Sequence, residues 1–197
     1  MKSKTSILLT SAAVLAAGSD AASSQDWNGA YAGLSYGATS GTSPSQPYVY
    51  DEGYQLDGSA VGAFAGLRWQ LNDQIVVGGE LALSGPIDVS PPASETGNGD
   101  GYSFNNLTDL KLTVGTPVGK ALVYGFTGVS AGTLEADGES YSATGMNFGL
   151  GVDYKINQKF SVGMEYIARN MSGYSSGGNP DDLKGANTLS LRASFNF

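Results

Sequence analysis

The sequence has no cysteine and no histidine among its 197 residues, and only 14% of its residues are charged. Without cysteine the chain cannot form a disulfide framework, an iron–sulfur cluster or a thiolate zinc site. Without histidine it has no histidine general base, no histidine-bound metal and no Ser-His-Asp triad. The net charge of −8 argues against nucleic acid as a partner, because phosphates attract Lys and Arg. These absences disfavour an ordinary helical enzyme.

The sequence also lacks a run of about 18 apolar residues, so it predicts no transmembrane helix. One shorter apolar run, residues 7–17, follows Lys2 and Lys4 and precedes the small residues around Ala21. A basic start, an apolar middle and small residues before a cleavage site are typical of a secretory signal peptide. A short buried helix is the alternative interpretation. We predict a signal peptide at residues 1–21 and a single domain at residues 22–197.

The chain does contain many glycines, 29 in all, together with residues that alternate between apolar and small or polar. Eight such segments predict strands of about ten residues. They are residues 30–39, 60–71, 75–84, 104–115, 121–132, 145–156, 160–169 and 188–197.

The connections between these segments alternate in length. Tight turns are predicted at Asn72-Asp73, residues 117–120 and Asn157-Gln158, and longer polar loops at residues 41–55, 85–102, 134–142 and 171–185. An even number of strands with short turns on one side and long loops on the other is typical of outer-membrane barrels. The prediction is therefore an all-β fold, an eight-stranded antiparallel up-and-down transmembrane β-barrel, which must close because lipid cannot satisfy an open sheet edge.

The fifth segment is ambiguous in phase. Leu122, Tyr124 and Phe126 form one apolar row, but Val129 and Ala131 fall on the opposite face. A β-bulge near Gly128 would reconcile the two halves of this strand.

A soluble lipocalin-like barrel is the chief alternative, and it would have the opposite polarity, with an apolar interior and a polar outside. Here the polar face consists of Gly, Ser and a few charges of both signs, which suit a narrow lumen where they can pair. We predict an ion pair between Arg68 and Glu80, joined by Arg169 and Glu165. The full predicted lumen network is Arg68, Glu80, Asp109, Lys111, Asp153, Lys155, Glu165, Arg169 and Arg192.

Aromatic residues gather near the short-turn and terminal ends of the predicted strands. Amphipathic rings settle at membrane interfaces, so they predict an aromatic girdle. The predicted members are Trp27, Trp69, Tyr124, Tyr154, Phe160, Phe195 and Phe197.

Several short motifs carry a family resemblance. The opening residues 27–33 (Trp-Asn-Gly-Ala-Tyr-Ala-Gly), the Gly-Gly-Glu at residues 78–80 and the Glu165-Tyr166 pair occur in order across the chain. In these features it resembles the small outer-membrane β-barrel proteins of alphaproteobacteria and their opacity-protein relatives. One departure is Thr113, where that family often has Arg. The resemblance implies that Phe197 is an assembly signal read by the outer-membrane assembly machinery.

The net charge is concentrated in the four long connections. They hold ten carboxylates and only one basic residue, Lys184, whereas the rest of the mature chain is neutral. Removing residues 1–21 changes the net charge from −8 to −9. Hard divalent cations relieve repulsion between carboxylates, so Ca²⁺ or Mg²⁺ is predicted to bridge the loops to lipopolysaccharide, with Glu135, Asp137 and Glu139 as ligands. Diffuse screening of a merely hydrated surface is the alternative.

These features predict a non-enzymatic structural surface protein with no cofactor, located in the outer membrane after export to the periplasm. Its predicted partners are outer-membrane lipid, lipopolysaccharide, the assembly machinery and divalent cations. Eight strands leave an interior that side chains can fill. Two alternatives stay open: a narrow porin-like channel for ions or small solutes, and an adhesin that acts through the loops.

Overall fold

A computed structural model describes residues 26–42, 55–89, 102–136, 139–174 and 180–197. The predicted signal peptide, residues 1–21, lies outside these ranges. The strands are β1 (Gly29–Thr42), β2 (Gln55–Gln70), β3 (Val76–Ser84), β4 (Ile87–Val89), β5 (Tyr102–Val118), β6 (Ala121–Ala136), β7 (Glu139–Lys155), β8 (Phe160–Tyr174) and β9 (Pro180–Asn196). The described residues include no helix long and apolar enough to cross a membrane.

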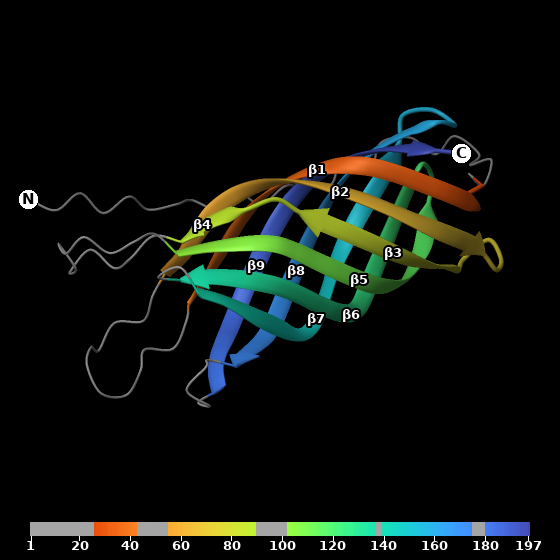
Figure 1. Ribbon diagram of the computed structural model, residues 1–197. Helices are drawn as coiled ribbons and strands as arrows, with labels where there is room; N and C mark the ends of the chain where they lie inside the picture. Colours follow the sequence, from red (N-terminus) through yellow and green to blue (C-terminus); the bar gives the residue numbers. More distant parts are fainter. Residues whose placement is uncertain (1–25, 43–54, 90–101, 137–138, 175–179) are drawn as a thin grey trace, which may run out of the picture.

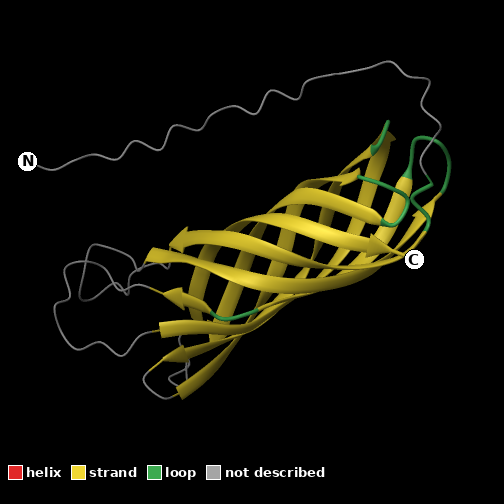
Figure 2. Cartoon of the chain, turned by 90° about the horizontal axis from the view of Figure 1, so that it is seen from above, coloured by secondary structure: helices red, strands yellow, loops and turns green. Residues whose placement is uncertain are grey.

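The strands form one closed antiparallel barrel. Each strand pairs with its neighbours in the order β3-β2-β1-β9-β8-β7-β6-β5, and the additional pairing of β3 with β5 closes the sheet (Figure 1). The short β4 also pairs with β5 and continues the line of β3 after Gly85 and Pro86. The barrel wall therefore has eight strands, which confirms the predicted fold class (Figure 2).

The strands are longer than the alternation predicts. Apart from the interrupted β3, they run for 14 to 17 residues instead of about ten, because pairing continues into the segments predicted as long loops. The clearest case is the β6–β7 connection, predicted at residues 134–142, where pairing reaches Ala136 and Glu139. Polar and small residues keep backbone pairing there because the neighbouring strands extend equally far.

The three turns predicted to be tight lie at one end of the barrel, together with the C-terminus (Figure 1). Two of them are closed by asparagine side chains. The Asn72 carboxamide oxygen accepts bonds from the backbone N–H groups of Gln74 and Ile75, and Asn157 does the same for Lys159 and Phe160. We call this the short-turn end. The third turn is confined to residues 119–120, so Pro117 and Val118, predicted as turn residues, belong to β5.

The outer face of the barrel is apolar. Large hydrophobic side chains point outward along every long strand, and Leu112, for example, is 69% exposed. Charged side chains occupy the lumen instead, each of them nearly inaccessible. This polarity is the inverse of a water-soluble barrel, and an apolar outer band is what a hydrocarbon environment requires.

The bulge predicted near Gly128 is wrong. The register of β6 with β5 and with β7 runs through Gly128 without a shift. Leu122, Tyr124 and Phe126 all point into the lumen, whereas Val129 points outward, so the strand needs no change of phase. The register shifts occur elsewhere, between Asn105 and Thr108 and between Arg169 and Asn170.

The predicted aromatic girdle is correct only in part. Trp69, Tyr154, Phe160 and Phe197 are exposed on the outer face at or near the short-turn end, and Phe195 is half-buried. Trp27 and Tyr124 are wrong, because both lie inside the lumen. The sequence around an aromatic residue does not always tell whether its side chain faces lipid or lumen. Here the lumen has room for the rings of Trp27 and Tyr124.

Candidate functional site

The lumen gathers all of the charged side chains that the alternation places on the inner face. The nine predicted network residues come from β2, β3, β5, β7, β8 and β9, and none is more than 6% exposed. Eight of them lie in three layers along the barrel axis, and the ninth, Lys155, lies at the short-turn mouth of the lumen. We call these the short-turn layer, the middle layer and the loop-side layer.

The middle layer is a ring of four alternating charges. Glu80 and Glu165 lie on β3 and β8, four strands apart around the wall, and Lys111 and Arg192 lie on β5 and β9, also four strands apart. Each carboxylate bonds both cations. Lys111 Nζ is 3.0 Å from Glu80 Oε1, and Arg192 contacts Glu80 and Glu165 through its two terminal nitrogens. The layer is neutral and joins opposite walls.

Aromatic side chains complete the middle layer. The Tyr31 hydroxyl donates to Glu80 Oε2 at 2.8 Å, and the Tyr124 hydroxyl donates to Glu165 Oε2 at 3.1 Å. The Arg192 guanidinium carbon lies 3.8 Å from the centroid of the Phe64 ring. Desolvated contacts of this kind between a cation and an aromatic face are favourable.

The short-turn layer is an ion pair across the full diameter of the barrel. Arg68 on β2 bonds Asp153 on β7, which lies four strands away in either direction. The Arg68 guanidinium also stacks 4.0 Å from the centroid of Tyr31. The predicted pair between Arg68 and Glu80 is therefore wrong. Arg68 is in register with Gly78, two residues from Glu80, and its side chain extends across the lumen rather than along the wall.

The loop-side layer is a two-pronged pair. Arg169 Nε and Nη2 donate to the two oxygens of Asp109 at 2.9 and 2.6 Å, a geometry that is among the strongest for this pair. The Ser130 hydroxyl also donates to Asp109, and Arg169 also donates to the Thr188 hydroxyl. Arg169 and Glu165 are both predicted to join the network around Glu80. Glu165 does so through Lys111 and Arg192, whereas Arg169 pairs with Asp109 in a different layer.

Glycines accommodate the aromatic rings of the lumen. Each ring lies over the glycine that is its direct partner in the neighbouring strand, so that a Cβ on that glycine would come within 2.6 Å of a ring atom. The pairs are Tyr31 with Gly66, Phe64 with Gly33, Tyr124 with Gly151, and Phe126 with Gly149. These four glycines therefore make room for aromatic rings of the adjacent strands.

The sequence interpretation missed the role of the N-terminal segment. Residues 26–28 precede β1 but turn into the short-turn end of the lumen, where Trp27 is only 3% exposed. Hydrogen bonds from the backbone and side chain of Asn28 hold the pKa of the Asp26 carboxyl below its usual value. Among the described residues no carboxylate pairs with Lys155, and its ammonium group donates to the Asp26 carbonyl oxygen. The only sign of this role in the sequence is the large apolar Trp27 in the polar segment just before β1.

Little free volume is left inside. A cavity of about 30 Å³ lies between the middle and loop-side layers, bordered by Ser35, Phe64, Ser84 and Arg192 among others. This volume holds about two water molecules. Side chains therefore fill the described part of the lumen.

The two remaining predicted sites lie outside this network. Phe197 is 77% exposed on the outer face, and its ring packs edge-on against Phe195 at 5.0 Å between centroids. For the predicted cation site, Glu135 and Glu139 lie near the ends of β6 and β7, and Asp137 falls outside the described residues. Within the described ranges there is no group of three or more acidic side chains that could hold a metal ion. The cation site stays a prediction.

A closed antiparallel barrel with an apolar outside, a charged and filled inside and strands long enough to cross hydrocarbon defines a transmembrane β-barrel protein. The family comparison agrees with this class. A family model described as "Outer membrane protein beta-barrel domain" matches residues 9–197, and the chain belongs to that family. It is an outer-membrane protein, so its short-turn end faces the periplasm. The finer resemblance to alphaproteobacterial and opacity proteins stays a prediction.

Solved structures show the same fold at low sequence identity. The outer membrane protein OprG from Pseudomonas aeruginosa is similar with a TM-score of 0.58 and 17% identity, over 86% of this chain and 96% of that one. Neisserial surface protein A gives 0.54 and 10%, over 85% and 97%. Ail, the attachment invasion locus protein of Yersinia pestis, gives 0.50 and 17%, over 86% and 99%. A search of curated proteins finds no match.

Proposed function

We propose that this protein is a non-enzymatic structural component of the outer membrane, a closed barrel that carries acidic loops at the cell surface. The observation that carries the proposal is the filled lumen. Each of the three layers contains an ion pair between strands that are three or four places apart around the wall. The cavity between two of the layers has a volume of only about 30 Å³. Such a lumen favours a structural role over a narrow channel.

The same geometry supports the absence of catalysis. A carboxylate that acts as an acid or base must reach a substrate proton. Asp109, Asp153, Glu80 and Glu165 are each bonded to a buried cation. These bonds occupy the carboxylates, and the cavity that borders Asp109 and Glu165 has a volume of only about 30 Å³.

Conductance across a planar lipid bilayer tests the proposal. We expect the wild-type protein to give no stable current steps. The double variant Glu80→Ser/Arg192→Ser removes one charge of each sign and opens the middle layer, so it should conduct ions. Leu112→Ala, on the outer face, is the matched silent control. Steady ion-selective steps from the wild-type protein would instead establish a narrow channel.

Attachment through the loops is the second candidate, and the charge distribution favours it. The barrel and turns of the mature chain are neutral, and its net charge of −9 lies in the segments predicted as long loops. An anionic surface of this kind can meet cationic partners, or lipopolysaccharide through divalent cations. Cell-binding assays with each loop deleted in turn would separate attachment from a purely structural role, which predicts no loss of binding.

A further inference from the structure

The N-terminal segment Asp26-Trp27-Asn28 closes the periplasmic mouth of the lumen. It turns inward at Gly29, whose φ of 118° is a conformation that side-chain-bearing residues rarely adopt. A Cβ at Gly29 would also meet the carbonyl oxygen of Phe197 at 3.0 Å. The glycine therefore sets the direction in which the segment leaves the first strand.

The segment is tied to opposite sides of the barrel. The backbone N–H of Trp27 donates to Gln70 Oε1 at 3.0 Å, and the backbone N–H of Gln70 donates to Asn28 Oδ1 at 2.7 Å. These bonds fix one side of the segment to the end of β2. On the other side Lys155, at the end of β7, donates to the Asp26 carbonyl. Since β2 and β7 are four strands apart in a wall of eight, the segment and the Lys155 side chain together span the mouth from one side to the other.

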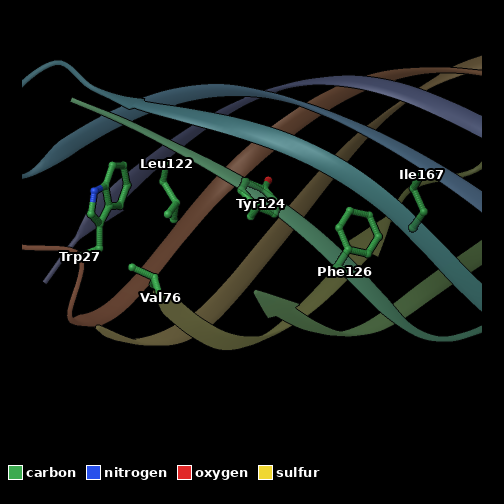
Figure 3. Packing of buried hydrophobic residues seen from close by; sticks show 6 residues of the cluster. All are labelled: Trp27, Val76, Leu122, Tyr124, Phe126 and Ile167. Atoms are coloured by element: carbon green, nitrogen blue, oxygen red, sulfur yellow. The ribbon is translucent and has the colours of Figure 1, made fainter. Parts of the chain in front are cut away.

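The indole of Trp27 fits a site made for a flat aromatic ring. Val76 and Leu122 pack beside it, as Figure 3 shows. Two cations face its ring: Lys155 Nζ lies 4.6 Å and the Arg68 guanidinium carbon 5.5 Å from the ring centroid. Both interactions are of the cation–π type, which favours an electron-rich aromatic.

Two buried donors at this site have no acceptor among the described residues. They are Trp27 Nε1 and Arg68 Nη1, and both side chains are more than nine-tenths buried. Buried donors are nearly always paired with protein or water. A molecule that replaced the Trp27 side chain would therefore meet the same two cations, Arg68 and Lys155. It could also accept a hydrogen bond from Arg68 Nη1.

We propose that residues 26–28 are a plug, a segment of the chain itself that occupies an aromatic-binding site at the periplasmic mouth. The site accepts a planar aromatic molecule when the Trp27 ring is absent or withdrawn. The two tryptophans of the chain allow a direct test, because Trp27 is buried inside and Trp69 lies on the outer face. Each can be removed separately.

Fluorescence quenching tests the plug. In Trp69→Phe, Trp27 is the only tryptophan, and acrylamide should quench the tryptophan fluorescence of the folded protein several-fold less than that of the same protein unfolded in urea. Adding Gly29→Ala should release the segment and raise the quenching, whereas Gly125→Ala, where the nearest atom to the new Cβ is 3.7 Å away, should not. Equal quenching of folded and unfolded Trp69→Phe would overturn the plug.

Complementation with indole tests the binding site. Trp27→Ala should leave a cavity that added indole fills, which raises the unfolding temperature of that variant. Trp69→Ala, which removes the same side chain from the outer face, should not respond, and it controls for indole dissolved in detergent. Equal shifts in both variants, or none in Trp27→Ala, would reject the aromatic site. The conductance result is independent, because the ion-pair layers close the lumen without the plug.

Discussion

Glu80→Gln is the most direct test of the lumen network. Glu80 is 2% exposed and accepts bonds from Lys111, Arg192 and Tyr31. The substitution keeps the size of the side chain but removes one negative charge. Glu165 is then the only carboxylate left to balance two buried cations. Leaving a buried charge without its partner costs about 3–5 kcal/mol, so the free energy of unfolding should fall by about that amount.

The measurement is unfolding in urea or guanidinium of protein refolded in detergent, followed by the altered mobility of the folded barrel on SDS gels without boiling. Asp73→Asn is the matched control, since it makes the same chemical change in an exposed turn. It should leave the midpoint nearly unchanged. The double variant Glu80→Gln/Lys111→Met restores the charge balance and should recover part of the lost stability.

Coincident midpoints for Glu80→Gln and Asp73→Asn would refute the reasoning, because they would mean that Glu80 is solvated or points elsewhere. A double variant less stable than Glu80→Gln alone would show that Lys111 contributes mainly through its cation–π contact with Phe126, whose ring centroid lies 5.0 Å from Nζ, rather than through the charge balance of the middle layer.

Three further predictions follow from other parts of the barrel. Gly151→Ala should destabilise by about 1–3 kcal/mol, because its Cβ would lie 2.5 Å from the ring of Tyr124; Gly125→Ala, on the outer face, should unfold like the wild type. Deleting Phe197 should lower outer-membrane levels in cells while purified protein still refolds in detergent, and normal levels in cells would reject its role as an assembly signal. Millimolar Ca²⁺ should slow proteolysis of the loops more than NaCl of equal ionic strength; equal protection would leave only screening and no site at Glu135, Asp137 and Glu139.

The alternation of the sequence predicts most of the architecture. Apolar rows such as Leu110, Leu112 and Val114 point outward as expected, and the charged residues between them point inward. The reason is that a strand has a strict period of two, so one face fixes the other. Because the outer face must contact hydrocarbon, an unbroken row of alternate apolar residues can be assigned to that face from the sequence.

The pairing of the lumen charges could not be predicted in the same way. Alternation tells which face a side chain takes but not its height along the axis, which depends on the stagger of the closed barrel. Arg68 and Glu80 look like neighbours in the hairpin, yet Arg68 pairs with Asp153 across the lumen, and Glu80 pairs with Arg192 as well as with Lys111 on the adjacent strand. Asn106, with a φ of 55°, shows the same limit, because a sequence gives little sign of which polar residue takes a left-handed conformation at a bulge.

The ion pairs that bridge the lumen join residues far apart along the chain. Glu80 and Arg192 are separated by 112 positions, and Arg68 and Asp153 by 85. Neither bond can form until the strands between its partners have paired and curled far enough to bring the two sides of the barrel together. Interactions that are absent from the folding transition state slow unfolding without speeding folding. These pairs should therefore form late and slow the unfolding of the inserted protein, with little effect on the rate at which it assembles.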